Sequence, residues 1–224
     1  NLLGRRNALD AVITEHGYST ESVKRLLQPG GLGKGFKHIG VLADFVEVDG
    51  QYARVVEDFL RDELNYIVVK SWDSADEGLR LLRTDVDGRA TFLVHPQDSQ
   101  AKFSFVAEES AYPVTPRTIV PLKSCIRVLN GFGKSLEVIL PKLRDGYITP
   151  DPKLARELAL ENPDAFFLAS SGETFHNVTV TGGKQHSEGP LSLKRELREV
   201  ARQLEQTERE VRELPEAADE WGRE

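Results

Sequence analysis

The chain has 224 residues, with 29 lysines and arginines against 36 aspartates and glutamates, so its formal net charge at pH 7 is -7. The length suits one or two domains with a substantial core, and the acidic balance argues against a protein coated with nucleic-acid contacts. A single cysteine, Cys125, excludes an internal disulfide and a cysteine-rich zinc site, and it favours a reducing compartment. No apolar run approaches the length of a membrane span.

Mostly apolar residues recur at alternating spacings of four and three near both ends of the chain. The first ladder is Leu2, Arg6, Leu9, Ile13 and His16, and the second is Leu193, Leu197, Val200, Leu204, Thr207, Val211 and Leu214. This rhythm is typical of a coiled-coil seam, and so narrow a stripe needs a partner helix. We therefore predict that residues 1–16 and 191–214 pair antiparallel within one chain. A helical hairpin that packs on its own domain is the alternative.

Neither helix shows a cap signal at its outer end, and the sequence contains no methionine. We therefore expect the chain to be a fragment of a longer protein.

Between the two ladders the sequence alternates between predicted strands and helices. The first set comprises a buried strand at 39–48, a helix at 51–64, a strand at 66–69, a helix at 73–82 capped by Asp73 or Ser74, and a strand at 90–94. Residues 95–118 contain three prolines and no steady period, which is typical of a connector.

A similar order follows the connector. Its elements are an apolar stretch at 126–129, a helix at 135–143, a strand at 147–149, a helix at 151–160, and three short strands at 165–169, 173–175 and 178–181. The sequence therefore predicts an α/β (α+β) globule made of two related small subdomains and flanked by an antiparallel coiled coil.

Enzyme motifs are incomplete. Gly133, Lys134 and Ser135 match the end of a phosphate-binding loop, but its first glycine would stand at position 128, which is Val128. The five histidines are scattered without a His-x-x-x-His pair, and Cys125 has no local partner. We expect no catalytic residues and no metal site.

Several segments resemble the hinge domain of SMC (structural maintenance of chromosomes) proteins of bacterial type. They are GYS at 17–19, GVLADFVEVD at 40–49, Val56 and Glu57, GRATFL at 88–93, SGE at 171–173, and VTVTGG at 178–183. The resemblance spans roughly residues 17 to 200. His176 and Asn177 depart from it, because many bacterial hinges have further glycines there.

The resemblance implies a homodimer formed through the two subdomains of each hinge. It implies dimer-interface residues on the last strand and after it, namely Val178, Val180, Gly182 and Gly183. An ordinary turn is the other interpretation of the Gly182–Gly183 pair. It further implies that ATP and Mg²⁺ bind only at head domains outside this chain, so that no cofactor is expected here, and that non-SMC subunits join the full-length protein. The expected location is the cytoplasm, in association with the nucleoid.

Basic residues gather near both ends of the globular part. The candidate DNA-binding residues are Lys34, Lys37, Lys184, Lys194, Arg195 and Arg198. Contacts of this kind go to phosphates and carry no sequence information, so any DNA binding is expected to be weak and non-specific. The alternative is that these charges are solvated and balanced by Glu188, Glu196 and Glu199.

The expected organisation is a coiled-coil stub and joint at 1–28, a first subdomain at 29–94, a connector at 95–118, a second subdomain at 119–189 and a coiled-coil stub at 190–224. Two other functions remain open. One is a small α/β nucleotide-binding or transferase domain with a helical hairpin, and the other is a chromosome-related coiled-coil adaptor without DNA contact.

Overall fold

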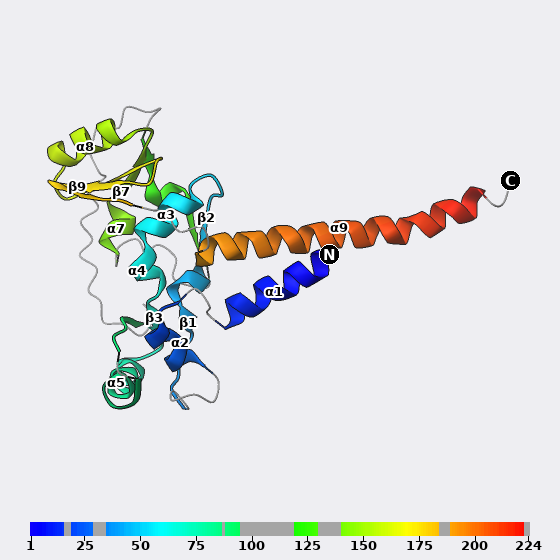
Figure 1. Ribbon diagram of the computed structural model, residues 1–224, viewed down its shortest axis with the longest axis horizontal. Coiled ribbons are helices and arrows are strands. Elements are labelled where there is room, and N and C mark those ends of the chain that lie inside the picture. Colours follow the sequence, from blue (N-terminus) through cyan, green and yellow to red (C-terminus); the bar gives the residue numbers. More distant parts are fainter. Residues whose placement is uncertain are drawn as a thin grey trace.

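A globular part carries a helical rod that projects from one side (Figure 1). The computed structural model describes residues 1–15, 19–28, 35–86, 88–94, 119–129, 140–183 and 189–221. The rod consists of α1 (Leu2–Thr14) and the first half of the much longer α9 (Pro190–Trp221). The short helix α2 (Glu21–Leu27) buries Val23, Leu26 and Leu27 in the globular part.

The first lobe holds a three-stranded sheet. In chain order it contains β1 (Gly40–Val41), a 3-10 helix (Leu42–Phe45), β2 (Val46–Val48), α3 (Ala53–Phe59), α4 (Arg61–Leu64), β3 (Ile67–Val69), α5 (Trp72–Leu81), a π-helical turn (Leu82–Val86) and β4 (Phe92–Val94). The sheet order is β1-β3-β4, with β1 antiparallel and β4 parallel to β3. The parallel pair is joined through α5, as a crossover connection requires.

The second lobe holds a five-stranded sheet. It contains β5 (Val120–Pro121), a 3-10 helix (Leu122–Ser124), β6 (Ile126–Val128), α7 (Pro141–Arg144), β7 (Gly146–Thr149), α8 (Pro152–Glu161), β8 (Phe166–Ala169), β9 (Thr174–His176) and β10 (Thr179–Thr181). The sheet order is β10-β9-β8-β7-β5, and only β7 and β8 are parallel.

The two lobes are related, as the sequence predicted. From β1 to α5, each element has a counterpart of the same type about 80 residues later, except that α3 has none among the described residues. The lobes meet through an antiparallel ladder between β2 and β6, in which Glu47 lies opposite Arg127. The duplicated pattern and this ladder together confirm the predicted α/β globule with two related halves.

Three predicted elements differ in detail. The single strand at 39–48 is wrong: a 3-10 helix divides it, because the Asp44 carboxylate accepts a hydrogen bond of 3.0 Å from the Val41 N–H and closes a turn. Gly40 permits this turn, since a Cβ there would lie 2.7 Å from Asp44 Oδ2. The helix at 51–64 breaks at Leu60, which is buried.

The cap of α5 also differs from the prediction. Ser71, rather than Asp73 or Ser74, is the N-cap, and its hydroxyl accepts a hydrogen bond from the Ser74 N–H. Of the helix predicted at 135–143, only α7 lies within the described residues, and the connector at 95–118 lies outside them.

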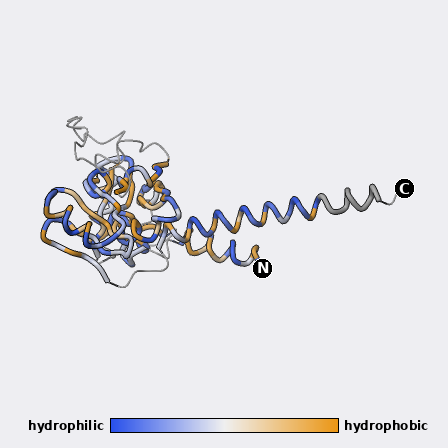
Figure 2. Tube along the Cα trace, turned by 90° about the horizontal axis from the view of Figure 1, so that it is seen from above, coloured by the Kyte–Doolittle hydropathy of each residue, from blue (hydrophilic) through white to orange (hydrophobic). Residues whose placement is uncertain are grey.

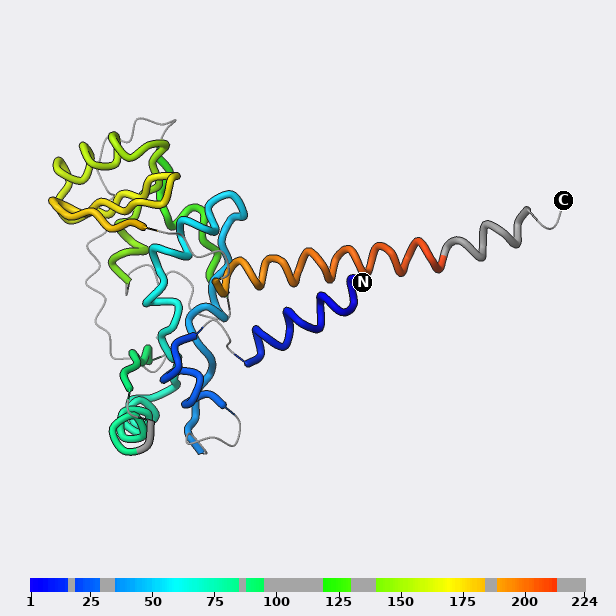
Figure 3. Tube along the Cα trace, viewed as in Figure 1, coloured from blue at the N-terminus to red at the C-terminus, as the bar shows by residue number. Residues whose placement is uncertain are grey.

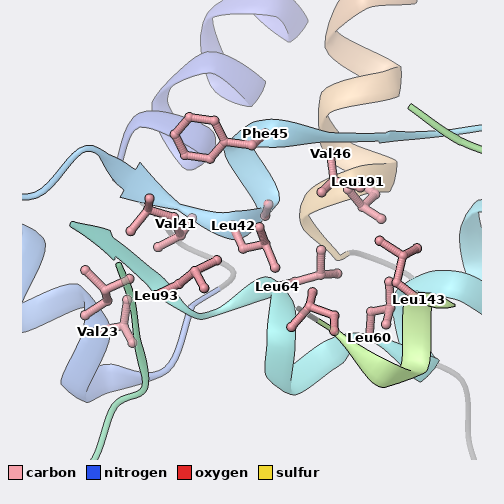
Figure 4. Packing of buried hydrophobic residues seen from close by; sticks show 14 of the residues in the cluster. Val23, Val41, Leu42, Phe45, Val46, Leu60, Leu64, Leu93, Leu143 and Leu191 are labelled. Atoms are coloured by element: carbon pink, nitrogen blue, oxygen red, sulfur yellow. The ribbon is translucent and has the colours of Figure 1, made fainter. Parts of the chain in front are cut away.

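One hydrophobic core extends across both lobes and the start of the rod. In the close-up of Figure 4, Leu60 and Leu64 of the first lobe lie beside Leu143 of α7 and Leu191 of α9. A smaller second cluster lies between α8 and the second sheet, where Ala155 and Ala159 pack on Phe167 and Phe175. The shared core therefore joins three parts of the chain that are distant in sequence.

The antiparallel coil predicted for the two ends is confirmed. α1 runs toward the globular part beside α9, which runs away from it (Figures 1 and 3). Leu193 and Val200 of the α9 ladder are buried, and the Arg5 guanidinium of α1 donates a hydrogen bond of 2.7 Å from Nε to Glu196. The outer part of the ladder differs, because α1 does not reach it and Val211 is 60% exposed. In the coloured part of α9 hydrophilic stretches alternate with short hydrophobic ones (Figure 2).

Because Val200 is buried and Val211 is exposed on the same helix, the same substitution should change stability differently at the two positions. Val200→Asp places a charge where the side chain is 4% exposed, so we expect it to lower the free energy of unfolding by roughly 2 kcal/mol. Val211→Asp, at a 60% exposed position, is the control and should change stability little. Circular dichroism during urea unfolding measures both. Equal losses in the two variants would contradict the observed seam.

Candidate dimerisation and DNA-contact surfaces

The hairpin of β9 and β10 forms an edge of the second sheet. Of the four residues predicted for the dimer interface, Val178 and Val180 lie on this hairpin, and Gly182 and Gly183 directly follow it. Asn177 and Val178 make its two-residue turn, and Asn177 has a φ of +49°. Asparagine tolerates this left-handed conformation better than other side-chain-bearing residues, so it serves here in place of a glycine. The turn places Val178 at the tip of the hairpin, where it is 82% exposed.

Val180 lies on the edge strand itself and is 61% exposed. It stands directly opposite Phe175, so the two side chains share one face of the sheet. Phe175 packs on that face against the cluster formed with α8, and Val180 extends the same apolar face outward. Among the described strands β10 pairs only with β9, and an exposed valine at such a sheet edge is suited to contact another protein surface.

Gly182 and Gly183 follow β10 and border a groove of about 530 Å³, here named the hairpin groove. Its other lining residues are Asp58, Phe59, Arg61, Asp62, Lys142, Phe166, Gly172, Thr174, His176, Thr179 and Thr181. Gly183 has a φ of +147°, which other residues rarely adopt, whereas nothing lies within 4 Å of a Cβ built there. A Cβ on Gly182 would lie 3.2 Å from the Glu173 side chain. Glycine is therefore favoured at position 183 by its positive φ, whereas the described residues of this chain leave space for a side chain there.

His176 forms part of the groove wall. Its ring stacks on Phe166 with centroids 4.2 Å apart, and its Nδ1 lies 2.9 Å from the Ala165 carbonyl oxygen. The imidazole therefore has a fixed place in the second lobe. The sequence marks His176 as a departure from glycine and as one of five scattered histidines, and nothing in it predicts this stacking.

Lys142 joins the two walls of the hairpin groove. Its ammonium lies 2.9 Å from a Glu63 carboxylate oxygen, 3.3 Å from the Phe59 carbonyl oxygen and 5.3 Å from the centre of the Phe59 ring. Lys142 belongs to the second lobe, and Glu63 and Phe59 belong to the first. This contact was missed from the sequence, because nothing in a single lysine indicates a partner some 80 residues away.

The start of α9 is bound to the first lobe by Glu57, a buried carboxylate on α3. Its Oε1 accepts hydrogen bonds from the N–H groups of Leu191 and Ser192, at 2.6 and 3.3 Å, and its Oε2 accepts one from the Ser192 hydroxyl at 2.6 Å. These are the N–H groups that a helix start leaves unpaired. In the sequence, Glu57 stands out only as part of the family resemblance.

The candidate DNA-binding residues on α9 contact the first lobe. Lys194 donates to the Asp44 carboxylate and to the Ala43 carbonyl oxygen, at 2.7 Å each, and Arg198 pairs with Glu47. Arg195 donates to the Gly50 carbonyl oxygen at 2.7 Å. The pairing of Lys194 and Arg198 is therefore with acids of the globular part and not with the glutamates of their own helix.

The other candidates lie elsewhere. Lys37 is exposed in the first lobe, and Lys34 and Lys184 lie outside the described residues.

A larger cavity of about 850 Å³, here named the junction cavity, lies where the two coil helices meet the globular part. It is lined by Leu2, Arg5, Gly50, Gln51, Arg54, Val55, Ser170, Ser192, Arg195, Glu196, Glu199, Val200 and Gln203. Within the described part of the chain, Arg54 and Arg195 have no carboxylate partner, whereas Arg5 is paired with Glu196. Glu199 also lines the cavity but pairs with Arg202, so Arg54 and Arg195 leave a local excess of positive charge. Arg54 was not predicted, because it is isolated among apolar residues in the sequence.

Groups suited to catalysis are not assembled in the described segments. They contain no cluster of three or more metal-ligating side chains. Burial raises the pKa of the Cys125 thiol to about 11, and its Sγ donates to the Leu122 carbonyl oxygen, so the thiolate that would act as a nucleophile is disfavoured. Among the same residues, no helix is long and apolar enough to cross a membrane.

Comparison with known proteins supports the resemblance seen in the sequence. The chain is 72% identical over 212 residues to a chromosome partition protein Smc of Koribacter versatilis, covering 94% of this chain and 16% of that protein. It is 26% identical to the Smc protein of Myxococcus xanthus, covering 78% of this chain and 14% of that protein. The chain thus spans about a sixth of the length of these relatives.

Solved structures share the fold. The hinge domain of Geobacillus stearothermophilus SMC, crystallised as an asymmetric dimer, matches with a TM-score of 0.79 at 22% identity, over 96% of this chain and 86% of that one. The SMC hinge domain of Pyrococcus furiosus matches with a TM-score of 0.52 at 19% identity, over 80% of this chain and 87% of that one.

The family model described as the flexible hinge domain of SMC proteins matches residues 36–159. This match covers more than half of the chain, runs from the first lobe through most of the second, and agrees with the folds just compared. The chain therefore belongs to the family of SMC hinge domains.

Proposed function

We propose that this chain is a dimerisation hinge that joins two coiled-coil arms. The proposal rests chiefly on the free edge of the second sheet, where Val178 and Val180 are exposed beside Gly182 and Gly183. Exposed apolar side chains on an unpaired strand edge favour association with another strand. The hinge itself is non-catalytic.

The related lobes suggest which edge would receive this strand. β4 is the first-lobe equivalent of β8. In the second lobe β9 pairs along the outer side of β8, so the corresponding side of β4 is where a further strand could pair. Among the described strands, β4 pairs only with β3. We infer that β10 of one copy approaches the β4 edge of another, and that a two-fold axis repeats this contact to give a closed dimer.

The hairpin valines provide the clearest test of the dimer. Both side chains are already exposed, so Val178→Glu with Val180→Glu removes little from the fold of one chain. We expect the parent, with a chain mass of 25.0 kDa, to sediment at about twice that mass at micromolar concentration. The double variant should shift toward a monomer, because two carboxylates would be desolvated in the interface.

A matched control introduces the same residue at the 60% exposed Val211 of α9 and should leave the dimer intact. Substitution of Gly183 is a weaker test, because its positive φ strains any replacement even in a monomer. A monomeric parent at all concentrations would refute the proposal.

A second proposed function is weak, non-specific contact with DNA phosphates. The supporting observation is the pair Arg54 and Arg195, which line the junction cavity without a described carboxylate partner. Of the three predicted residues on α9, Arg195 has the most available charge, since Lys194 and Arg198 are paired with Asp44 and Glu47. We propose that Lys34, Lys37 and Lys184 supplement Arg54 and Arg195, and that Lys194 and Arg198 contribute less.

DNA binding can be tested with charge reversals that change net charge equally. Arg54→Glu with Arg195→Glu should reduce a mobility shift with duplex DNA at low salt by at least about tenfold, because phosphate contacts dominate such binding. The control is Arg202→Glu with Arg209→Glu, two exposed arginines farther along α9. If both double variants lose affinity alike, the effect reflects overall charge and not the junction cavity.

We further propose the setting of this hinge within a longer protein. The relatives are chromosome partition proteins, and the chain spans a small part of their length. The domain limits proposed from the sequence place hinge subdomains at 29–94 and 119–189, with a connector at 95–118 between them and coil stubs at 1–28 and 190–224. ATPase heads and any non-SMC subunits would then act through other parts of the protein, in the cytoplasm and at the nucleoid. Membership of the hinge family replaces the alternative of a transferase or nucleotide-binding domain.

A further inference from the structure

The ladder that joins the two lobes has an internal symmetry. Its register pairs Val46 with Val128, Glu47 with Arg127, and Val48 with Ile126. Position 127 is the counterpart of position 47 in the 80-residue repeat, so the central pair consists of two equivalent positions. The flanking pairs exchange equivalents, since 128 corresponds to 48 and 126 to 46. The lobes are thus related by a local two-fold axis between Glu47 and Arg127.

The backbone and the apolar side chains of this ladder do not by themselves determine which strand pairs with which. An isologous contact fits a surface to a copy of itself, so β2 could pair with β2 of another copy, or β6 with another β6. The flanking residues would be apolar in every case. Only the central position distinguishes the three pairings, because Glu47 would face Glu47 in one and Arg127 would face Arg127 in another.

The charges around this position favour the observed pairing. The Arg127 guanidinium donates from Nε to Glu47 Oε2 at 2.9 Å, and Arg198 of α9 pairs with the other oxygen of the same carboxylate. Asp49 and Arg195 line a third cavity, of about 460 Å³, together with Glu47, Arg127 and Arg198. Like charges directly opposite one another in a ladder are destabilising. A β6–β6 pairing would bring two arginines together without the acid of β2.

We propose that Glu47 and Arg127 determine partner choice at the lobe interface. They direct each first lobe to a second lobe, of its own chain or of another copy, and they reject a lobe of the same kind. The β10 edge is a separate surface, so this inference does not depend on the proposed dimer. If Glu47 and Arg127 do not determine pairing, the dimer mass expected from sedimentation stays the same.

Crosslinking within one chain gives the first test. Val46 and Val128 form a pair without mutual backbone hydrogen bonds, since the bonds lie at Phe45–Leu129 and Asp49–Cys125 on either side. Such pairs bring Cα atoms to about 4.5 Å, within the range of a disulfide. Cysteines at 46 and 128 should therefore crosslink within the parent chain, and the buried Cys125 thiol, with its raised pKa, should not compete.

Charge reversals then alter the crosslinking yield in a defined order. Glu47→Arg should lower it most, because the reversed charge would face both Arg127 and Arg198. Arg127→Glu should lower it less, because Arg198 still holds Glu47. The double variant E47R with R127E should recover part of the parent yield, because it restores opposite charges at the centre of the ladder but leaves the new arginine beside Arg198. If the double variant is no better than E47R alone, the pair does not determine pairing.

Mixed chains test partner choice directly. One chain carries E47R and a cysteine at 46, and the other carries R127E and a cysteine at 128, and the two are refolded together. Each chain alone would oppose like charges in its own ladder, whereas exchange of lobes between the chains places opposite charges in both ladders. We expect the yield of crosslinks between chains to exceed that of cysteine chains with parent charges by roughly two- to tenfold. Equal yields would overturn the proposal.

Discussion

The position of the coil depends on the hydrogen bonds that Glu57 accepts from the start of α9. A helix leaves its first N–H groups unpaired, and their positive end favours a carboxylate. Glu57 is buried in the first lobe and holds Leu191 and Ser192. Gly189 makes room for it, since a Cβ there would collide with the Glu57 side chain. Once the helix start is fixed, its periodicity brings Lys194, Arg195 and Arg198 to the same lobe.

The spatial neighbours of α9 differ from its neighbours in sequence. α9 follows the second lobe in sequence, yet the hydrogen bonds described above between α9 and the globular part go to the first lobe. The second lobe is held to the first by the shared core, the Lys142 contact with Glu63, and the β2–β6 ladder. The two lobes and the rod are consequently joined by contacts between residues that are far apart in sequence, and loss of one contact affects the placement of the others.

The sequence predicted what depends on local periodicity and could not predict what depends on distant pairing. The ladders around Leu9 and Val200 indicated the coil, and the repeated order of elements indicated related lobes. The division of the strand at 39–48 was missed, because it depends on one Asp44 side chain folding back to Val41. The partners of Glu57, Lys142 and Lys194 follow from the tertiary fold, and no spacing in the sequence marks them. The roles of Val178, Val180, Gly182 and Gly183 stay predictions.

The docking of α9 also determines how a mechanical load would pass through the molecule. A pull along the rod reaches the globular part at Ser192, Lys194 and Arg198, and each of these residues transmits it to the first lobe. α2, which follows α1, is also buried in the core of that lobe. Tension would therefore enter each chain through its first lobe. In the proposed dimer it would then pass to the partner across the β10–β4 contacts, so the shared core and the β2–β6 ladder between the lobes would also carry load.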